Sequence, residues 1–333
     1  MSKASFMLGF IAGVTSVGGV VAQKEPVAWL TFSSDEPFTV SKTRTWDGVL
    51  YYSTDTHNWS EWDGKTIASA EHMGGQKIYM RGIGNSKIND NSLYSMRIEG
   101  SKVRCDGNIE NLLDYKVVAN GQHPVMGDSC YYYLFDSCKS LTHAPDLPAT
   151  KLTKQCYAHM FSNCTSLVHA PKLPATALAE LCYYWMFYKC ASLASEPELP
   201  ATTLAEQCYS RMFSNCTSLV HAPKLPATVL AKYCYSNMFE ECSSLISLPE
   251  LPATTLANYC YTSMFRECSN IKMSVTQTGE YQTPYRIPTT GTGTSWENSL
   301  GGSSLSYMFS DTGGTFTGTP EINTTYYTSN TVV

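Results

Sequence analysis

The residues with the clearest chemical potential are cysteines, of which the chain has thirteen. Twelve recur at a fixed interval of 26 residues, and Cys105 stands outside the pattern as an isolated thiol. Cysteines could form disulfides, bind zinc or supply nucleophilic thiols. The two series are Cys130, Cys156, Cys182, Cys208, Cys234 and Cys260, and Cys138, Cys164, Cys190, Cys216, Cys242 and Cys268.

The spacing within one repeat argues against a disulfide inside it. The two cysteines of a repeat are eight residues apart, which in a helical segment is a rise of about 12 Å, whereas bridged Cα atoms lie within about 7 Å. Equivalent cysteines of neighbouring repeats would stack at about 4.8 Å, so disulfides between repeats stay open, although each cysteine would have two equal neighbours. We predict a structural ladder of buried, reduced thiols. The spacing resembles no CxxC zinc site, so we expect no metal.

Histidines and charged residues also recur at fixed places in the repeat. Imidazoles occupy one position in three copies, and serine replaces them in two others. A row of imidazoles could bind a metal or respond to pH, but the interruption by serine favours simple duplication of the repeat. The candidate ligand contacts on the expected exposed strand side are His143, His169, Lys172, Glu196, His221, Lys224 and Glu250.

Motifs of known enzymes are missing from the sequence. It contains no GxSxG, HExxH, GxxxxGK[ST] or complete GxGxxG motif. We therefore expect neither an enzyme nor a cofactor; a catalytic site in the N-terminal region is an alternative that no group of residues supports. The net charge is -5 and no basic tract occurs, which disfavours nucleic acid as a partner.

The elements that carry these residues are six copies of the unit CYxxMFxxCxSLxxxPxLPATxLAxx. Apolar spacings of three and four in CYxxMFxxC, as at Tyr209, Met212, Phe213 and Cys216, predict a short helix. The Ser-Leu segment predicts a brief strand that proline ends. Thr-Leu-Ala predicts a second helical turn with threonine as its N-cap. A fixed period of this length predicts a stacked array.

The helix-to-strand corner resembles that of the BspA-like class of bacterial leucine-rich repeats. It reads MFSNCTSL at Met160–Leu167 and Met212–Leu219, and MFEECSSL at Met238–Leu245. The resemblance implies a leucine-rich-repeat solenoid over residues 126–273 and, for the family, surface proteins of anaerobic mouth and gut bacteria that are often adhesins. It implies no catalytic site. The 26-residue unit is longer than many of that class, and we expect the extra residues in PxLPAT.

The flanking regions lack complete copies of the repeat. Residues 24–125 alternate apolar and polar residues between turn-forming clusters, which predicts an antiparallel β-sandwich-like domain with a hairpin around residues 55–58. Residues 274–333 are rich in Thr, Gly and Ser, and predict an insertion followed by a degenerate capping repeat in which Ser304 and Thr312 replace the cysteines. The predicted class is therefore an α+β multidomain protein.

The N-terminus predicts export. Lys3 precedes an uncharged run that ends near Ala22, which fits a signal peptide over residues 1–22; an uncleaved hydrophobic anchor is the alternative. We expect a secreted or cell-surface protein that contacts the membrane only through this segment.

Taken together, these features predict an exported, non-enzymatic adhesion or binding protein. Its repeat surface would meet a protein or glycan ligand on a host or neighbouring cell. The alternative is a virion-surface or tail-fibre appendage of a bacteriophage, with the same role in host contact and an uncleaved N-terminus.

Overall fold

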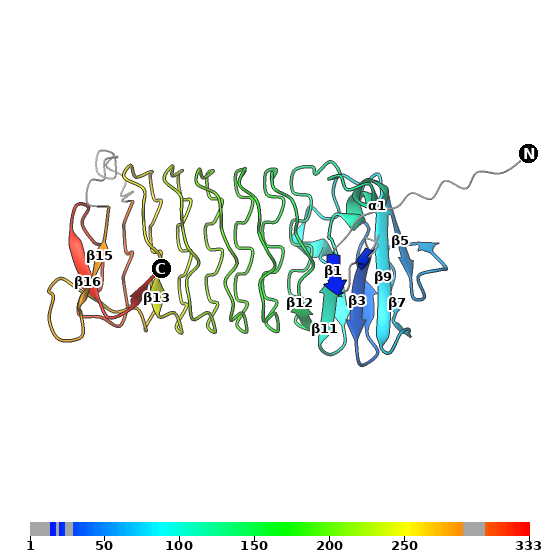
Figure 1. Ribbon diagram of the computed structural model, residues 1–333, viewed down its shortest axis with the longest axis horizontal. Coiled ribbons are helices and arrows are strands. Elements are labelled where there is room, and N and C mark those ends of the chain that lie inside the picture. The colour runs from blue at the N-terminus through cyan, green and yellow to red at the C-terminus, as the bar shows by residue number, and fades with distance from the viewer. Residues whose placement is uncertain (1–13, 18–19, 24–28, 289–303) are drawn as a thin grey trace, which may run out of the picture.

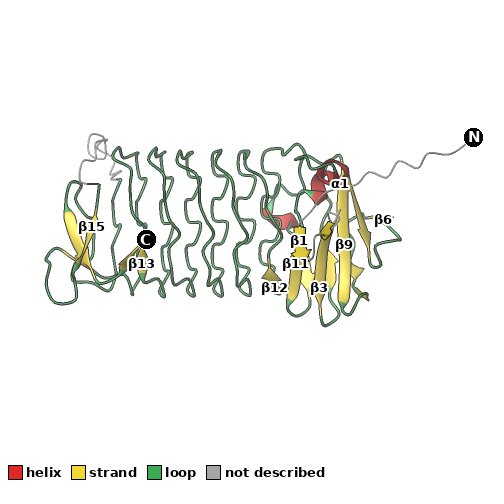
Figure 2. Ribbon diagram, in the orientation of Figure 1, coloured by secondary structure: helices red, strands yellow, loops and turns green. Residues whose placement is uncertain are grey.

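The computed structural model is an elongated stack of coils with a sheet-rich region at its N-terminal end (Figure 1). It describes residues 14–17, 20–23, 29–288 and 304–333. The coils lie side by side along the long axis, and a few short strands close the opposite end (Figure 2). The predicted signal segment, residues 1–22, falls largely outside the described residues, apart from the paired strands β1 (Val14–Val17) and most of β2 (Val20–Gln23).

Two sheets build the N-terminal region. The larger has the order β12-β11-β3-β9-β5-β6 with β8 beside β9, and the smaller has the order β10-β4-β7. A single α-helix, α1 (Asn111–Ala119), and a short 3-10 helix, η1 (Ser92–Tyr94), accompany them in this region. The strands are β3 (Leu30–Ser34), β4 (Thr39–Ser41), β5 (Val49–Ser53), β6 (Ser60–Glu61), β7 (Ile67–Ala68), β8 (Ala70–Glu71), β9 (Gln76–Ile83), β10 (Arg97–Glu99), β11 (Val103–Asp106) and β12 (Leu141–His143).

Buried and partly exposed side chains alternate along these strands, and the buried ones form the core of the N-terminal region. In β3 every second residue is buried, because successive side chains point to opposite faces. The predicted hairpin is confirmed: β5 and β6 pair antiparallel with Tyr51 opposite Glu61. Trp62, just past the hairpin, is buried and stacks on Trp46 with ring centroids 5.2 Å apart.

The larger sheet is not wholly antiparallel, and it does not end where the predicted domain ends. Its edge strand β12 belongs to the first repeat and pairs with β11 in parallel. The first coil thus continues the N-terminal sheet, and one hydrophobic core runs from Leu30 to Tyr326.

The predicted helices of the repeat are absent from the described coils, so the chain is mostly β rather than α+β. CYxxMFxxC forms consecutive turns in which backbone amides alternate between two kinds of acceptor. Tyr184 N donates to Leu181 O three residues back at 3.1 Å, whereas Phe187 N donates to Met212 O of the next coil at 2.9 Å. An α-helix would direct its amides four residues back along its own axis and leave the coils unlinked.

Left-handed backbone conformations make this alternation work. Leu181, Trp185 and Lys189 have φ values of 59°, 55° and 58°. This left-handed region costs residues other than glycine about 1–2 kcal/mol each. Each of the three donates its amide to the next coil, as in the 3.1 Å bond from Trp185 N to Ser210 O. The bonds between coils hold the residues in this conformation.

Columns of identical side chains fill the stack. Seven phenylalanines lie one above another, with neighbouring centroids 5.6–5.8 Å apart and nearly parallel rings, and six tyrosines form a second column at the same spacing. Offset stacking of this kind favours a single register between coils. The phenylalanines are Phe135, Phe161, Phe187, Phe213, Phe239, Phe265 and Phe309, and the tyrosines are Tyr131, Tyr157, Tyr183, Tyr209, Tyr235 and Tyr261.

On the opposite side of each coil, strand structure is shorter than predicted. Within the described repeats it is limited to β12, to β13 (Ser247–Leu248) and to isolated parallel bridges such as His143 to His169. The expected helical turn at Thr-Leu-Ala is instead extended, and Leu204 N donates to Val229 O of the next coil. A second row of inter-coil bonds replaces local helical ones.

Both ends of the stack are covered. Met96 of the N-terminal region donates its amide to Leu134 O, as a preceding coil would. At the other end Phe265 N donates to Met308 O, and buried Ser304 and Thr312 lie at the cysteine positions of this last coil. Residues 289–303 of the predicted insertion lie outside the described part.

Short strands close the C-terminal end of the stack. These strands are β14 (Met273–Ser274), β15 (Thr283–Arg286), β16 (Thr325–Thr328) and β17 (Thr331–Val332), with order β14-β16-β15 and β13 beside β17. None of the described helices is long and apolar enough to cross a membrane.

The phenylalanine column should dominate stability. Phe187 is fully buried between two other rings, so Phe187→Ala is expected to lower the free energy of unfolding by about 3–5 kcal/mol through lost contacts and a cavity. Urea denaturation followed by circular dichroism measures the loss. Val229→Ala, at a 53% exposed side chain, is the control and should change stability by less than about 0.5 kcal/mol; equal effects would contradict the role of the column.

Candidate functional site

The predicted histidine row is only partly assembled. His143 and His169 lie in adjacent coils with ring centroids 6.3 Å apart, whereas His221 is two coils further along. Nε2 of His143 lies 2.6 Å from a guanidinium nitrogen of Arg104, and burial together with that cation lowers the pKa of His143. In its neutral form the imidazole of His143 accepts a hydrogen bond from Arg104, so its Nε2 atom already has a partner within the protein. The described residues contain no group of three or more His, Cys, Asp or Glu that could hold a metal ion.

The predicted charged residues fall at separate places on the strand side. Lys172 and Glu196 both line a hollow of about 330 Å³ between two coils, together with prolines of both coils such as Pro171 and Pro197. Lys224 is exposed further along the stack. Glu250 borders a different hollow of about 320 Å³ beside Tyr285 and Arg286. The seven predicted contacts therefore form no single site.

The cysteine ladder lies in the core. All thirteen cysteines are buried free thiols. In the second series the thiol of Cys138 donates to Met96 O of the N-terminal region, and each later thiol donates to a backbone carbonyl of the preceding coil, as Cys190 Sγ does to Phe161 O at 3.1 Å. Burial raises the pKa of Cys156 to about 12, and it raises the pKa of the other ladder thiols as well, so the nucleophilic thiolate form is suppressed.

These thiols should be inert in the folded protein. We expect Ellman's reagent to label them at neutral pH only after denaturation, because the thiols are covered and protonated. All thirteen should then react in guanidinium chloride without prior reduction. Rapid labelling of the native protein, or fewer than thirteen thiols after unfolding, would contradict a buried and reduced ladder.

A partly exposed aromatic cluster on the turn side of the first three coils was missed by the sequence reasoning. We call it the aromatic platform. Tyr133 stacks on His159 with centroids 4.1 Å apart, His159 meets Trp185 at 5.0 Å, and Trp185 meets Tyr188 at 4.4 Å. The platform consists of Tyr132, Tyr133, His159, Tyr184, Trp185 and Tyr188.

The repeat places these rings. Tyr133, His159 and Trp185 occupy one position of three successive units, each with positive φ. The same position holds Arg211 in the next unit, and the Arg211 guanidinium lies 5.5 Å from the Trp185 ring. The sequence signal was the recurrence of rings at intervals of 26 residues; variation at this position in the other units concealed it.

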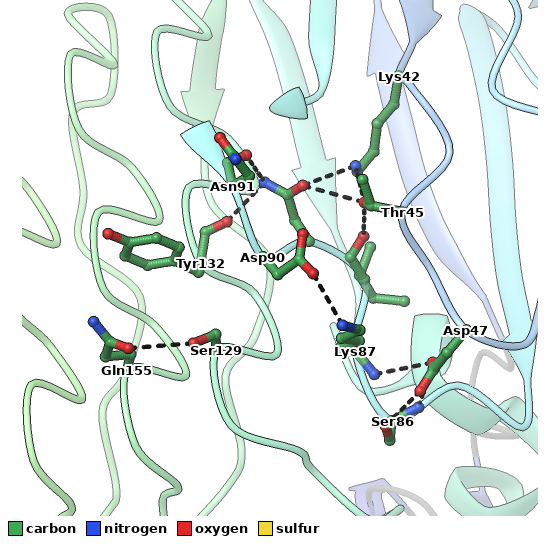
Figure 3. A network of polar contacts seen from close by, with 12 residues as sticks. Lys42, Thr45, Asp47, Ser86, Lys87, Asp90, Asn91, Ser129, Tyr132 and Gln155 are labelled. Atoms are coloured by element: carbon green, nitrogen blue, oxygen red, sulfur yellow. Dashed lines mark hydrogen bonds and ion pairs between the residues drawn. The ribbon is translucent and has the colours of Figure 1, made fainter. Parts of the chain in front are cut away.

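A polar network ties the platform to the N-terminal region (Figure 3). Asn89 Nδ2 donates to the backbone carbonyl of Tyr132 at 2.7 Å, while Asn89 Oδ1 accepts from Lys42 Nζ at 3.0 Å. Lys42 is buried and also donates to Thr45 Oγ1 and to the carbonyl of Tyr94. Burial lowers the pKa of Lys42 to about 7. The backbone at the edge of the platform is therefore held by hydrogen bonds that are buried or part-buried.

The platform is suited to binding by contact with ring surfaces. Five of its rings are half-buried, and His159 is only 6% exposed beneath them. Mutual stacking orders the rings before any ligand arrives, which reduces the entropy lost on binding. The indole Nε1 of Trp185 is covered and finds no hydrogen-bond partner among the described residues, so the platform holds one donor that the protein leaves unpaired.

His159 should make stability depend on pH. Burial lowers the pKa of His159 to about 4, below the ordinary value near 6.5. The unfolded chain therefore binds a proton first as the pH falls, so this contribution is complete above pH 6.5 and is lost between pH 6.5 and 4. The loss is about 3 kcal/mol at most.

Urea denaturation at several pH values tests this expectation. The unfolding free energy of His159→Phe should fall less than that of the wild type between pH 6.5 and 4. His221→Gln, at an exposed histidine, is the control and should follow the wild type. Parallel pH profiles for wild type and His159→Phe would contradict a buried neutral imidazole.

Comparison of this chain with known proteins identifies no relative, so the proposed function depends on the geometry of the site. The corner that resembles BspA-like repeats lies at the turn side of each coil, next to the platform positions. That resemblance stays a prediction. No protein-family model, curated protein or solved structure matches this chain.

Proposed function

We propose that the chain is a non-enzymatic binding protein whose stack of coils presents an extended surface to a protein or glycan ligand. The observation that carries the proposal is the aromatic platform. Tyrosine, tryptophan and arginine dominate the binding energy of many protein interfaces, and all three gather where Tyr184, Trp185 and Arg211 meet. A ligand that covers partly exposed aromatic rings removes their apolar surface from water, which contributes favourable binding free energy.

The proposal includes the finer fold class. A leucine-rich-repeat solenoid of the BspA-like kind accounts for buried leucines that recur in step with the cysteines, such as Leu167, Leu193 and Leu219. A β-sandwich-like N-terminal domain accounts for the core shared by two sheets, to which Phe32 of the larger sheet and Val40 of the smaller contribute. Stacked repeats of this type offer extended binding surfaces rather than one deep pocket.

The proposal also places the protein outside the cell or on its surface, where a ligand on a host or neighbouring cell is accessible. The apolar run that precedes Ala22 supports export.

A cell-binding experiment tests the proposal. Fluorescently labelled full-length chain is incubated with cultured epithelial cells and with anaerobic gut bacteria, and bound fluorescence is measured by flow cytometry. We expect saturable binding that Tyr188→Ala combined with Trp185→Ala reduces at least tenfold. The control Lys65→Ala, at an exposed side chain of the N-terminal region, should bind as the wild type does. Equal melting temperatures verify that each variant is folded.

The opposite outcome is equally definite. If the folded protein binds none of these cells, or if the platform variant binds as well as the wild type, the aromatic platform is not the ligand surface. Turnover of a substrate by the purified chain would contradict the non-enzymatic assignment.

A further inference from the structure

Resting on the proposed function, we propose that the aromatic platform is a subsite for a neutral saccharide, whose glycan chain runs along the stack of coils. The rings of Tyr133, Trp185 and Tyr188 would pack against pyranose rings, and polar side chains further along the stack would bind hydroxyl groups. Four features of the described residues favour a saccharide.

The first feature is the lack of charge on the platform itself. Five of its six members are tyrosine or tryptophan, and His159 is held neutral by its burial at ordinary pH. A pyranose offers an uncharged face of C–H groups that packs against the face of an aromatic ring. No ion needs to be desolvated in such a contact.

The second feature is preorganisation. Tyr133 lies on His159, and Tyr188 lies on Trp185, so the rings form a supported surface rather than separate protruding side chains. Protein hot spots more often insert a side chain into a pocket of the partner. A supported surface suits a ring that is itself rigid.

The third feature is the polar surface that continues the row beyond the platform. Arg211 donates to Glu240 at 2.8 Å, and Arg266 donates to the other oxygen of Glu240 at 3.2 Å. The side chain of Glu240 is only 6% exposed, so the two guanidinium groups are fixed by a buried carboxylate. A guanidinium has five N–H donors, which leaves donors for hydroxyl oxygens of a ligand.

The fourth feature lies at the far end of the same row. Tyr307 occupies the repeat position of Tyr133 and Trp185 and is 63% exposed. It borders a hollow of about 480 Å³ that Arg266 and Asp311 line together with the hydroxyls of Ser263, Ser310 and Thr317. A ring beside hydroxyls, a guanidinium and a carboxylate offers both stacking and hydrogen bonds.

The regular repeat of the coils is also suited to a ligand that is itself a polymer of similar units. Equivalent positions recur on every coil, and the phenylalanine column inside the stack keeps neighbouring coils in register, with ring centroids 5.6–5.8 Å apart. A glycan chain also presents the same groups at regular intervals. A row with rings at both ends and fixed polar groups between them can contact several sugar units in succession.

The experiment uses the indole N–H of Trp185 as its reporter. Neutral manno-, malto-, cello- and chito-oligosaccharides of four to six units are titrated into the ¹⁵N-labelled full-length chain, and indole cross-peaks are followed by NMR. The cross-peak absent from Trp185→Phe identifies Trp185. We expect one series to shift this peak in a saturable manner, and Trp185→Ala to weaken binding roughly tenfold. Trp185→Phe keeps a stacking ring and should weaken binding less.

Controls separate this inference from the proposed function. Tyr51→Ala removes a partly exposed ring of β5 in the N-terminal region and should leave the affinity unchanged. In parallel, the cells of the binding experiment are treated with glycosidases, and binding should fall at least tenfold. Binding that survives deglycosylation while no oligosaccharide shifts the Trp185 peak overturns the saccharide inference and leaves a protein ligand. A saccharide that binds without moving that peak overturns the location of the site.

Discussion

The hydrogen bonds between successive coils are the constraint on which the rest of the structure depends. In the turn segment every second amide leaves its own coil and reaches a carbonyl of the next one, as Phe187 N reaches Met212 O. This arrangement requires a left-handed backbone at residues with large side chains, Trp185 among them. A single coil could not sustain that conformation, since its stabilising partners belong to its neighbours. Stability is therefore a property of adjacent coils.

Regular coil spacing determines what the interior can contain. Rings at equivalent positions stack on one another, and the thiol of Cys190 finds the Phe161 carbonyl in the coil before it. Cysteine fits because it is small, apolar and able to donate one hydrogen bond. The last coil departs from this pattern: Thr312 Oγ1 donates to Phe309 O within its own coil. The hydroxyl of Thr312 thus finds its acceptor within the last coil, where a cysteine of the second series would donate to the coil before it.

The same spacing determines the surface. A residue that varies between units is still held at a fixed distance from its equivalents, so a run of rings at one position becomes a continuous cluster. Tyr133, His159 and Trp185 form such a cluster because the coils beneath them are in register. The network around Lys42 and Asn89 extends this order into the N-terminal region. The proposed ligand surface is thus a consequence of how the core stacks.

The sequence alone determined the period, the six units and the positions of the ladder cysteines, because regular burial leaves a regular pattern. It could not distinguish a helix from linked turns, since Tyr209, Met212, Phe213 and Cys216 lie on one side of either. Only the tertiary structure decided that question, through amides that bond across coils. The platform was equally hidden: Tyr133, His159 and Trp185 recur at one position, but their contact depends on the distance between coils, which no single repeat contains.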